Sequence, residues 1–357
     1  MFGGSYHVGY EVARSLIGEG YAVFLCGLGA PSSAELSVKY PGIGPLRVLK
    51  PCVDLSKISI LTPFFPQMLA YFERMLEPDI VWTDTDLYAR SKTRNQKIVE
   101  YIHGLSEAVT GGISPKYERG LWRVYGRAYL EVYRKKSRRN PFQEANRVVA
   151  NSNYTASLVE KMWGEMPRVI YPPTDNSYFE CREGDRNGVI TVARIAWDKR
   201  IEDLIFACAG VPVSIKVVGA ISDPHCHLML RRTVEKLGLR VQWFNRVSDE
   251  VLRRELCSAK VFVSTGTETF GLNVVEAMAS GVPVIVRKSG APYWDILAGG
   301  KYGLGYDTIG QLREQVIRLL SDENEWRHYS QLGTERARAF DVTIFRKEIL
   351  QIVGELE

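Results

Sequence analysis

The sequence predicts an α/β fold of two doubly wound domains that face each other across a cleft. The chain has 357 residues, which is more than a single hydrophobic core usually serves. Short runs of β-branched and aromatic residues alternate with amphipathic helical patterns, as in right-handed βαβ units around a parallel sheet. The double proline Pro172-Pro173 marks a boundary, so we expect one domain over 1–175 plus 336–357 and another over 176–335.

The first half of the chain opens with a glycine loop, a helix and a strand over 21–26. A doubly wound domain normally places a strand before such a loop. Either the true start lies further upstream, or this sheet is built without that strand. Two further strands are expected within 78–86 and 97–107, and His103 stands at the end of the second. A strand and a helix then share residues 147–162.

The second half alternates strands and helices more regularly, which favours a parallel sheet covered by helices. The expected strands are 188–193, 213–219, 240–244, 261–265 and 282–286. The helices expected among and after them include 249–258, 273–280, 308–321 and 343–353.

Composition and charge narrow the function. The net charge of +5 suits anionic ligands without requiring nucleic acid. No apolar run approaches the roughly 20 residues that span a bilayer, and the amino terminus lacks a signal pattern. The six cysteines lie far apart without a CxxC pair, which favours reduced thiols in the cytoplasm over disulfides or zinc.

The segment GTETFGLNVVEAMASGVPVIV, residues 266–286, contains the first candidate site. Glu268 falls in a loop at the carboxyl end of a strand, and Glu276 falls in the first turns of the next helix. A helix start after Gly271 offers backbone N–H groups and a positive dipole to an anion. Two glutamates beside it would accept hydrogen bonds from hydroxyls on either side of a diphosphate. The alternative is structural, with Asn273 and Glu276 forming a capping box and Glu268 a solvated loop acid.

Two cations upstream favour the ligand-binding interpretation. In VARIAWDKRIEDLI, Arg194 and Lys199 stand between a strand and a helix of the same predicted sheet. Both would neutralise a diphosphate, and the fixed charge of a guanidinium suits that task. The alternative places both side chains in solvent on the lip of the helix. The two cations and the two acids together indicate a nucleotide-sugar site.

These motifs resemble those of glycosyltransferase family 4, the retaining enzymes of the GT-B type, which have two Rossmann-like domains. The match joins Arg194-x4-Lys199 to Glu268-x7-Glu276 and extends to the amino-terminal GG and to RVVANSNYT. Further details, VIYPPTD, SGAPYWDIL and YIHG, are similar to the asparagine-linked-glycan α-1,2-mannosyltransferase branch. The resemblance implies a retaining hexosyltransferase that uses GDP-mannose and a lipid-linked or glycan acceptor.

The resemblance also implies roles for individual residues. Glu276 would hold the ribose hydroxyls and Glu268 those of the donor sugar, while the two cations bind the diphosphate. His103 would lie near the C6 hydroxyl of the donor sugar, with a structural loop histidine as the alternative. The implied catalytic residues are His103, Arg194, Lys199 and Glu268. The other implied donor-binding residues are Gly3, Gly4, Gly219, Asn245, Arg246, Val247, Phe270, Gly271, Leu272 and Glu276.

No residue in the sequence stands out as a general base or a covalent nucleophile. The resemblance implies transfer on one face of the sugar, with the departing phosphate taking the proton of the acceptor. Positioning and charge stabilisation would then supply the catalysis, without a metal ion or other cofactor. Two alternatives stay open: transfer of glucose from UDP-glucose to a soluble acceptor, and a catalytically silent nucleotide-binding protein.

Two motifs invite a metal interpretation. The DTD motif at 84–86 has the spacing of manganese sites, but it lies in the first predicted domain while the donor motifs lie in the second. The HCH motif at 225–227 lacks a second ligand cluster at zinc spacing. We expect both to be loops and expect no metal site.

A basic, aromatic segment at 116–139 predicts membrane contact. Its aromatic residues fall on one helical face, as in a helix that lies on an anionic membrane and reaches a lipid acceptor. The alternative is a packed helix with a solvated charged face, and nucleic-acid binding is weaker because no recognised module accompanies the segment. The protein would then be cytoplasmic and peripheral at the membrane face. The expected contact residues are Trp122, Arg123, Arg127, Arg134, Lys135, Lys136, Arg138 and Arg139.

Overall fold

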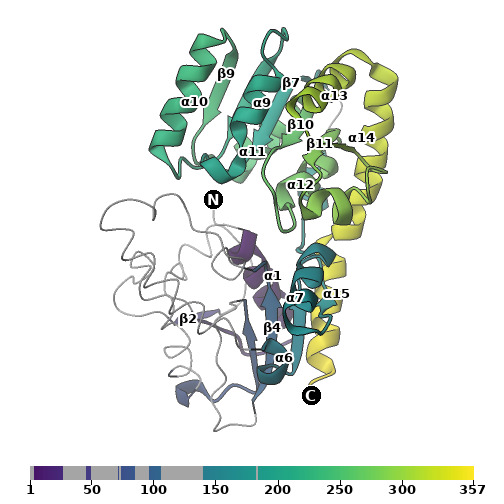
Figure 1. Cartoon of the computed structure of the whole chain (residues 1–357). Helices are drawn as coiled ribbons and strands as arrows, with labels where there is room; N and C mark the ends of the chain where they lie inside the picture. Colours follow the sequence, from purple (N-terminus) through teal and green to yellow (C-terminus); the bar gives the residue numbers. More distant parts are fainter. Residues whose placement is uncertain are drawn as a thin grey trace, which may run out of the picture. The chain divides into compact units, whose positions relative to one another are not determined.

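Helices and strands alternate along the chain in a computed structural model, shown in Figure 1. The structure describes residues 4–26, 46–49, 71, 74–84, 96–105, 140–181 and 184–357. The chain divides into two compact units. The carboxyl-terminal unit comprises Met1–Gly4, Ser152–Tyr154 and Tyr171–Phe345, and the amino-terminal unit comprises Ser5–Asn151, Thr155–Ile170 and Arg346–Glu357.

The carboxyl-terminal unit is built on a six-stranded parallel sheet with the order β12-β11-β10-β7-β8-β9. From β7 the chain proceeds outward to β8 and β9, then returns to the other side of β7 with β10 and proceeds outward again to β11 and β12. The strand order therefore reverses between β7 and β10, which opens a crevice at their carboxyl ends. The strands are β7 (Asn187–Val192), β8 (Ser214–Val218), β9 (Arg240–Phe244), β10 (Ala259–Ser264), β11 (Val284–Arg287) and β12 (Leu304–Tyr306).

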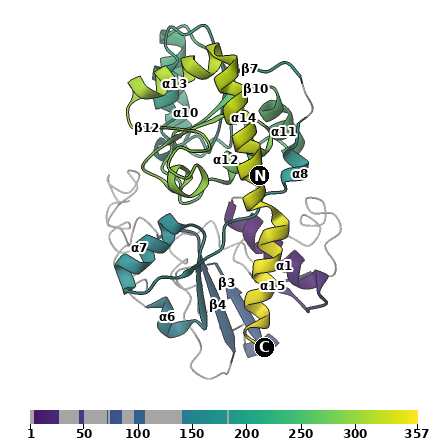
Figure 2. The same ribbon diagram turned by 90° about the vertical axis from the view of Figure 1, so that its right-hand side faces the viewer.

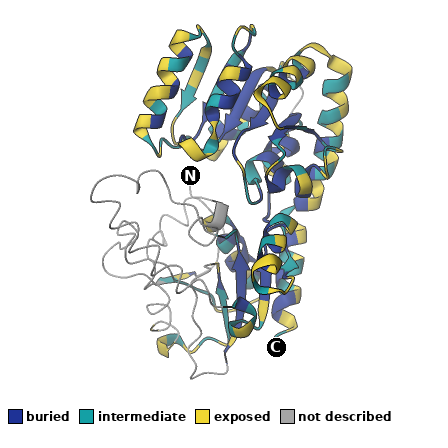
Figure 3. Ribbon diagram, viewed as in Figure 1, coloured by how far each residue is buried: buried dark blue, intermediate teal, exposed yellow. Residues whose placement is uncertain are grey.

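Alternate residues of these strands pack on opposite faces of the sheet. Val261 and Val263 of β10 cluster with residues of α9, α10 and α13, whereas Phe262 between them clusters with residues of α11 and α12. Figure 3 shows the inner strands largely in the buried colour between the covering helices, whereas the edge strand β9 is intermediate to exposed. The parallel sheet with helices on both faces confirms the predicted α/β architecture. The helices are α9 (Ile201–Ala207), α10 (Pro224–Lys236), α11 (Asp249–Cys257), α12 (Leu272–Ala279), α13 (Ile309–Ser321) and α14 (Glu323–Ala337), with the short α8 (Asn176–Phe179).

The amino-terminal unit contains a four-stranded parallel sheet, β3-β4-β5-β6, and a parallel pair, β1-β2. The first helix packs on the pair through Tyr10 and Ala13, which meet Leu46. Figure 2 shows α6 and α7 on one side of the larger sheet and α15 on the other. The strands are β1 (Phe24–Cys26), β2 (Arg47–Leu49), β3 (Ile80–Thr83), β4 (Lys97–Ile102), β5 (Arg147–Ala150) and β6 (Arg168–Val169). The helices are α1 (Gly4–Gly18), α6 (Pro141–Glu144), α7 (Asn153–Trp163) and α15 (Val342–Gly354), of which the first residues of α1, α7 and α15 belong to the carboxyl-terminal unit.

The end of the chain is held in the amino-terminal unit by ion pairs. The Glu355 carboxylate lies 3.4 Å from Nη1 of Arg168 and 3.5 Å from Nε of Arg147. Residues 116–139, with all eight expected membrane contacts, and Gly3 lie outside the described residues. No helix within the described ranges combines the length and the apolarity that a membrane span needs.

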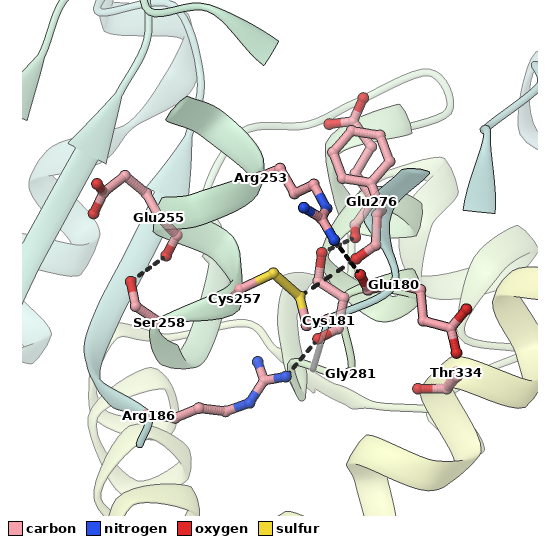
Figure 4. The surroundings of a disulfide bond; sticks show 12 residues. Glu180, Cys181, Arg186, Arg253, Glu255, Cys257, Ser258, Glu276, Gly281 and Thr334 are labelled. Atoms are coloured by element: carbon pink, nitrogen blue, oxygen red, sulfur yellow. Dashed lines mark hydrogen bonds between the residues drawn. A yellow bond between two sulfur atoms is a disulfide. The ribbon is translucent and has the colours of Figure 1, made fainter. Parts of the chain in front are cut away.

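The expectation that reduced thiols are favoured over disulfides is wrong for one pair of cysteines. Cys181, which follows α8, and Cys257, the last residue of α11, form a disulfide with their Cα atoms 5.6 Å apart (Figure 4). A sequence separation of 76 residues hides this pair from any local spacing rule, because only the fold brings the two segments together. Nη2 of Arg253 also donates to the Glu180 carbonyl at 2.7 Å and so holds the same two segments.

Removing this disulfide with Cys181→Ala/Cys257→Ala is expected to destabilise the carboxyl-terminal unit by about 4 kcal/mol, because the bond closes a long loop in the unfolded chain. Calorimetry with and without reductant measures the effect. The reductant should lower the Tm of the wild type and leave that of the double variant unchanged. Alkylation of native protein also tests the bond. Cys208 is the internal control for this labelling, because it is a buried free thiol whose pKa is raised by burial to about 12. Alkylation of both Cys181 and Cys257 in native, unreduced protein would contradict the bond.

Candidate functional site

The loops after β7 and β10 meet at the crevice where the strand order reverses. Lys199 ends the 3₁₀ turn η4 (Trp197–Lys199) that follows β7, and Glu268 lies in the loop between β10 and α12. Nζ of Lys199 lies 2.8 Å from Oε1 of Glu268, and the two side chains are 15% and 21% exposed. The structure thus joins one predicted cation and one predicted acid that stand 69 positions apart in the sequence.

Arg194 reaches the same corner through Asp198, a residue that the sequence analysis did not single out. Nη2 of Arg194 lies 3.0 Å from Oδ2 of Asp198, and Nζ of Lys199 lies 3.7 Å from the same oxygen. The Arg194 side chain is 56% exposed, and exposed pairs of this kind are weak. A more highly charged anion can therefore replace Asp198 as the partner of the guanidinium.

The backbone of Glu268 is fixed by the loop after β11. The Ala291 N–H donates to the Glu268 carbonyl at 2.9 Å, and the hydroxyls of Thr267 and Ser289 lie 2.9 Å apart. Gly290 packs against Glu268 so closely that a Cβ atom there would lie 2.9 Å from its backbone N and O. Glycine at 290 is thus required by the close approach of the two loops.

The start of α12 follows Glu268 directly. Gly271 is its N-cap, with a left-handed φ of 99° and no side-chain cap bond. The capping-box alternative for Asn273 is therefore wrong, because Asn273 is already inside the helix and its side-chain amide donates to the Val192 carbonyl at 2.5 Å. The helix begins at Leu272, one residue before the expected start. A helix start without a side-chain cap can direct its N–H groups and dipole at an anion.

Other residues predicted to bind the nucleotide-sugar lie along the same edge of the sheet. Glu276 is half-buried one turn into α12, and Phe270 is buried before it. After β8, the Gly219 N–H donates to the Phe244 carbonyl at 2.9 Å. After β9, Oδ1 of Asn245 accepts from the Ile221 N–H at 3.2 Å. Arg246 and Val247 follow, and Arg246 has a left-handed φ of 50°.

His103 lies in the amino-terminal unit, directly after β4. Its Nε2 is 3.7 Å from Oδ2 of Asp84, which follows β3, and its carbonyl accepts from the Asn151 amide at 2.8 Å. The ring of Tyr101 lies edge-on at 5.0 Å. Gly4, another predicted residue, begins α1.

The two metal-like motifs differ in their outcome. In the motif at 84–86 only Asp84 is described. The motif at 225–227 is not the loop that we expected but the first turn of α10, because Asp223 caps it and Pro224 sits at the first helical position. Across the described ranges, no group of three His, Cys, Asp or Glu side chains is placed to hold a metal ion.

Asp295 is a buried acid that the sequence analysis missed. It lies on the π-helical turn η5 (Pro292–Ile296) and is 3% exposed. Oδ1 accepts from the Asn153 N–H at 2.7 Å, and Oδ2 accepts from the Tyr154 N–H at 3.1 Å. Burial and the charge of Asp295 raise the pKa of Tyr171, whose hydroxyl lies 3.2 Å from Oδ1, to about 12. The signal for it in the sequence was the unusual SGAPYWDIL.

Comparison with known proteins identifies the class. The family model described as "Glycosyltransferase Family 4" matches residues 2–178, and the model "Glycosyl transferases group 1" matches residues 179–336. The fold is similar to that of a sucrose-phosphate synthase from Thermosynechococcus elongatus, with a TM-score of 0.77 and 18% identity over 99% of this chain and 94% of that one. Anabaena Alr3699/HepE in complex with UDP and glucose has a TM-score of 0.73 and 18% identity over 99% and 96%.

The chain belongs to the family 4 glycosyltransferases of the GT-B type, which confirms the resemblance found in the sequence. A curated relative, the GDP-Man:Man(3)GlcNAc(2)-PP-Dol alpha-1,2-mannosyltransferase of Xenopus laevis, is 24% identical over 42% of this chain and 35% of its own. The sucrose synthase of Melioribacter roseus is 29% identical over 34% of this chain and 17% of its own. The matched part therefore spans less than half the length of either relative.

The close approach of Gly290 to Glu268 yields a test of the site's packing. Gly290→Ala should lower the free energy of unfolding by about 1–3 kcal/mol, because the new methyl group forces the two loops apart. Gly310→Ala is the matched control, since its Cβ would meet nothing closer than Oγ1 of Thr308 at 3.8 Å and alanine is the better helix former. Urea unfolding should give shifts of opposite sign. Equal stability of the two variants would contradict the described loop packing.

Proposed function

We propose that this protein is a retaining hexosyltransferase that moves mannose from GDP-mannose to a glycan or lipid-linked acceptor. The observation that carries the proposal is the 2.8 Å contact between Nζ of Lys199 and Oε1 of Glu268. It lies where β7 and β10 diverge and just before the uncapped start of α12. One corner of the sheet thus offers a cation and N–H groups to a diphosphate, and a carboxylate to sugar hydroxyls.

Each residue of this corner has a distinct task in the proposal. Lys199 and Arg194 bind the diphosphate, and the ion pair with Glu268 holds the Lys199 ammonium in place. The second carboxylate oxygen of Glu268 accepts from hydroxyls of the donor sugar. Glu276 accepts from the ribose hydroxyls. The resemblance in sequence also assigns His103 to the C6 hydroxyl of the donor sugar, and its Nε2 has no hydrogen-bond partner among the described residues.

The transfer breaks the bond between the anomeric carbon and the phosphate oxygen and forms a bond from that carbon to the acceptor oxygen. The acceptor proton passes to the departing phosphate. Negative charge grows on the diphosphate during this step, so groups already directed at it stabilise the transition state more than the bound donor. Lys199, Arg194 and the start of α12 supply that stabilisation without a metal ion. We therefore expect turnover to persist in EDTA.

The choice of donor and acceptor draws on the relatives. Mannosyltransferases whose names specify GDP-Man are among them, which favours GDP-mannose and a lipid-diphosphate acceptor. Sucrose synthases are also among them, so transfer from UDP-glucose to a soluble acceptor is the second candidate. Contact with an anionic membrane, and a lipid acceptor reached through it, rest on the basic segment 116–139 of the sequence alone.

A donor panel distinguishes these functions. GDP-mannose should raise the Tm of the protein more than UDP-glucose at equal concentration, because binding to the folded state stabilises it by mass action. Slow release of GDP from GDP-mannose without acceptor should accompany this shift. A larger shift with UDP-glucose would favour the second candidate. Binding without any release of nucleoside diphosphate, with every donor tried, would favour the catalytically silent alternative.

Replacing Lys199 should affect turnover more than capture of the donor. Lys199→Met is expected to lower kcat by a factor on the order of 10², because it removes one cation that stabilises the charge developing on the diphosphate. Calorimetric titration with GDP should show a much smaller loss of affinity. Lys260→Met is the control, since Lys260 pairs with Glu323 in the same unit, outside the site. Unchanged turnover in Lys199→Met would refute the assigned role.

A further inference from the structure

The turn that carries Lys199 ends in an unusual backbone conformation. Arg200, the next residue, has φ 49° and ψ 39°, which is the left-handed region that long side chains rarely occupy. Arg200 closes η4 and at the same time begins α9. Its conformation therefore sets the direction in which the chain leaves Lys199. A strained residue directly after a predicted catalytic cation calls for a group that holds it there.

Asp203 is that group. Its carboxylate accepts two hydrogen bonds from the Arg200 guanidinium, from Nε at 2.9 Å and from Nη2 at 3.0 Å. The Asp203 side chain is 2% exposed and that of Arg200 is 45% exposed, so the carboxylate is buried, and its two parallel hydrogen bonds fix the orientation of the guanidinium. The Asp203 N–H also donates to the Arg200 carbonyl at 3.0 Å. Side chain and backbone of Asp203 thus hold Arg200 from both sides.

The same carboxylate reaches the loop that supports Glu268. Nη1 of Arg287, at the end of β11, donates to Oδ2 of Asp203 at 2.9 Å. Arg287 lies three residues before Gly290, which packs on the Glu268 backbone. Asp203 therefore connects the segment after Lys199 with the segment behind Glu268. The buried ring of Tyr306 also packs against Arg287, with its centroid 5.9 Å from Cζ of the guanidinium.

We propose that Asp203 is a positioning residue. Through Arg200 it fixes the conformation of the turn that carries Lys199, and through Arg287 it fixes the position of that turn relative to Glu268. The effect on turnover rests on the proposed function, whereas the effect on the turn itself does not.

The network has a distinct mutational signature. Asp203→Asn keeps the shape of the side chain and removes its charge, so it should reproduce the Lys199→Met phenotype: a tenfold or greater loss of kcat with a smaller loss of GDP affinity. In the Lys199→Met background the same change should cost less than twofold, because its effect passes through Lys199. Adding Arg200→Gly to Asp203→Asn should recover part of the lost kcat, since glycine adopts the left-handed region freely.

Glu255→Gln is the matched control for Asp203→Asn. Glu255 is also a buried acid between two cations of the same unit, with Nζ of Lys216 at 2.8 Å and Nη2 of Arg254 at 3.0 Å, but it does not contact the site. Its loss should lower the Tm and leave kcat within twofold. Hydrogen exchange of residues 196–204 in the ligand-free protein should rise in Asp203→Asn and stay unchanged in Glu255→Gln.

Each result decides the proposal. Wild-type kcat in Asp203→Asn, or fully additive losses with Lys199→Met, would overturn it. Should Asp203→Asn not fold, Arg200→Ala and Arg200→Gly replace it, and equal kcat in these two variants would overturn it. If the wild type turns over no nucleotide-sugar, the proposed function fails, and hydrogen exchange alone then decides whether Asp203 holds the turn.

Discussion

The contact between Lys199 and Glu268 organises the carboxyl-terminal unit at its functional edge. The two residues come from opposite sides of the point where the strand order reverses, so their contact fixes the loop after β7 relative to the loop after β10. Because both side chains are mostly shielded from water, each charge depends on its partner for compensation. In the proposed function, the same pair binds a ligand that carries both phosphate and hydroxyl groups.

Near this pair, the start of α12 has no side-chain cap, whereas hydrogen bonds hold neighbouring segments in place. Gly271 begins α12 without a side-chain cap, whereas Ser152 donates to the Thr269 carbonyl at 2.6 Å and Asp295 accepts the backbone N–H groups of Asn153 and Tyr154. Polar groups held in advance need not reorganise when charge moves, which is the property that the proposed transfer mechanism requires of its site.

The disulfide changes what can be inferred from the cysteines about the redox compartment of the protein. The cytoplasmic expectation drew support from the absence of close cysteine pairs, and the bond between Cys181 and Cys257 removes that support. It joins the segment after α8 to the end of α11, and α11 packs beside α12 in one core. The bond and the Lys199–Glu268 pair thus belong to the same compact unit, although they lie in different segments.

The sequence by itself determined the alternation of strands and helices and the family, and it predicted that Lys199 and Glu268 serve one site. Hydrophobic periodicity, turn residues and short chemical motifs are all local patterns of the sequence, so they can be recognised without coordinates. Only the tertiary structure decided the partners of Asp203 and Asp295, the disulfide, and the use of Gly271 rather than Asn273 at the start of α12. Each of these depends on groups that are distant in sequence, and their distances become short only once the sheet has formed and its loops have packed.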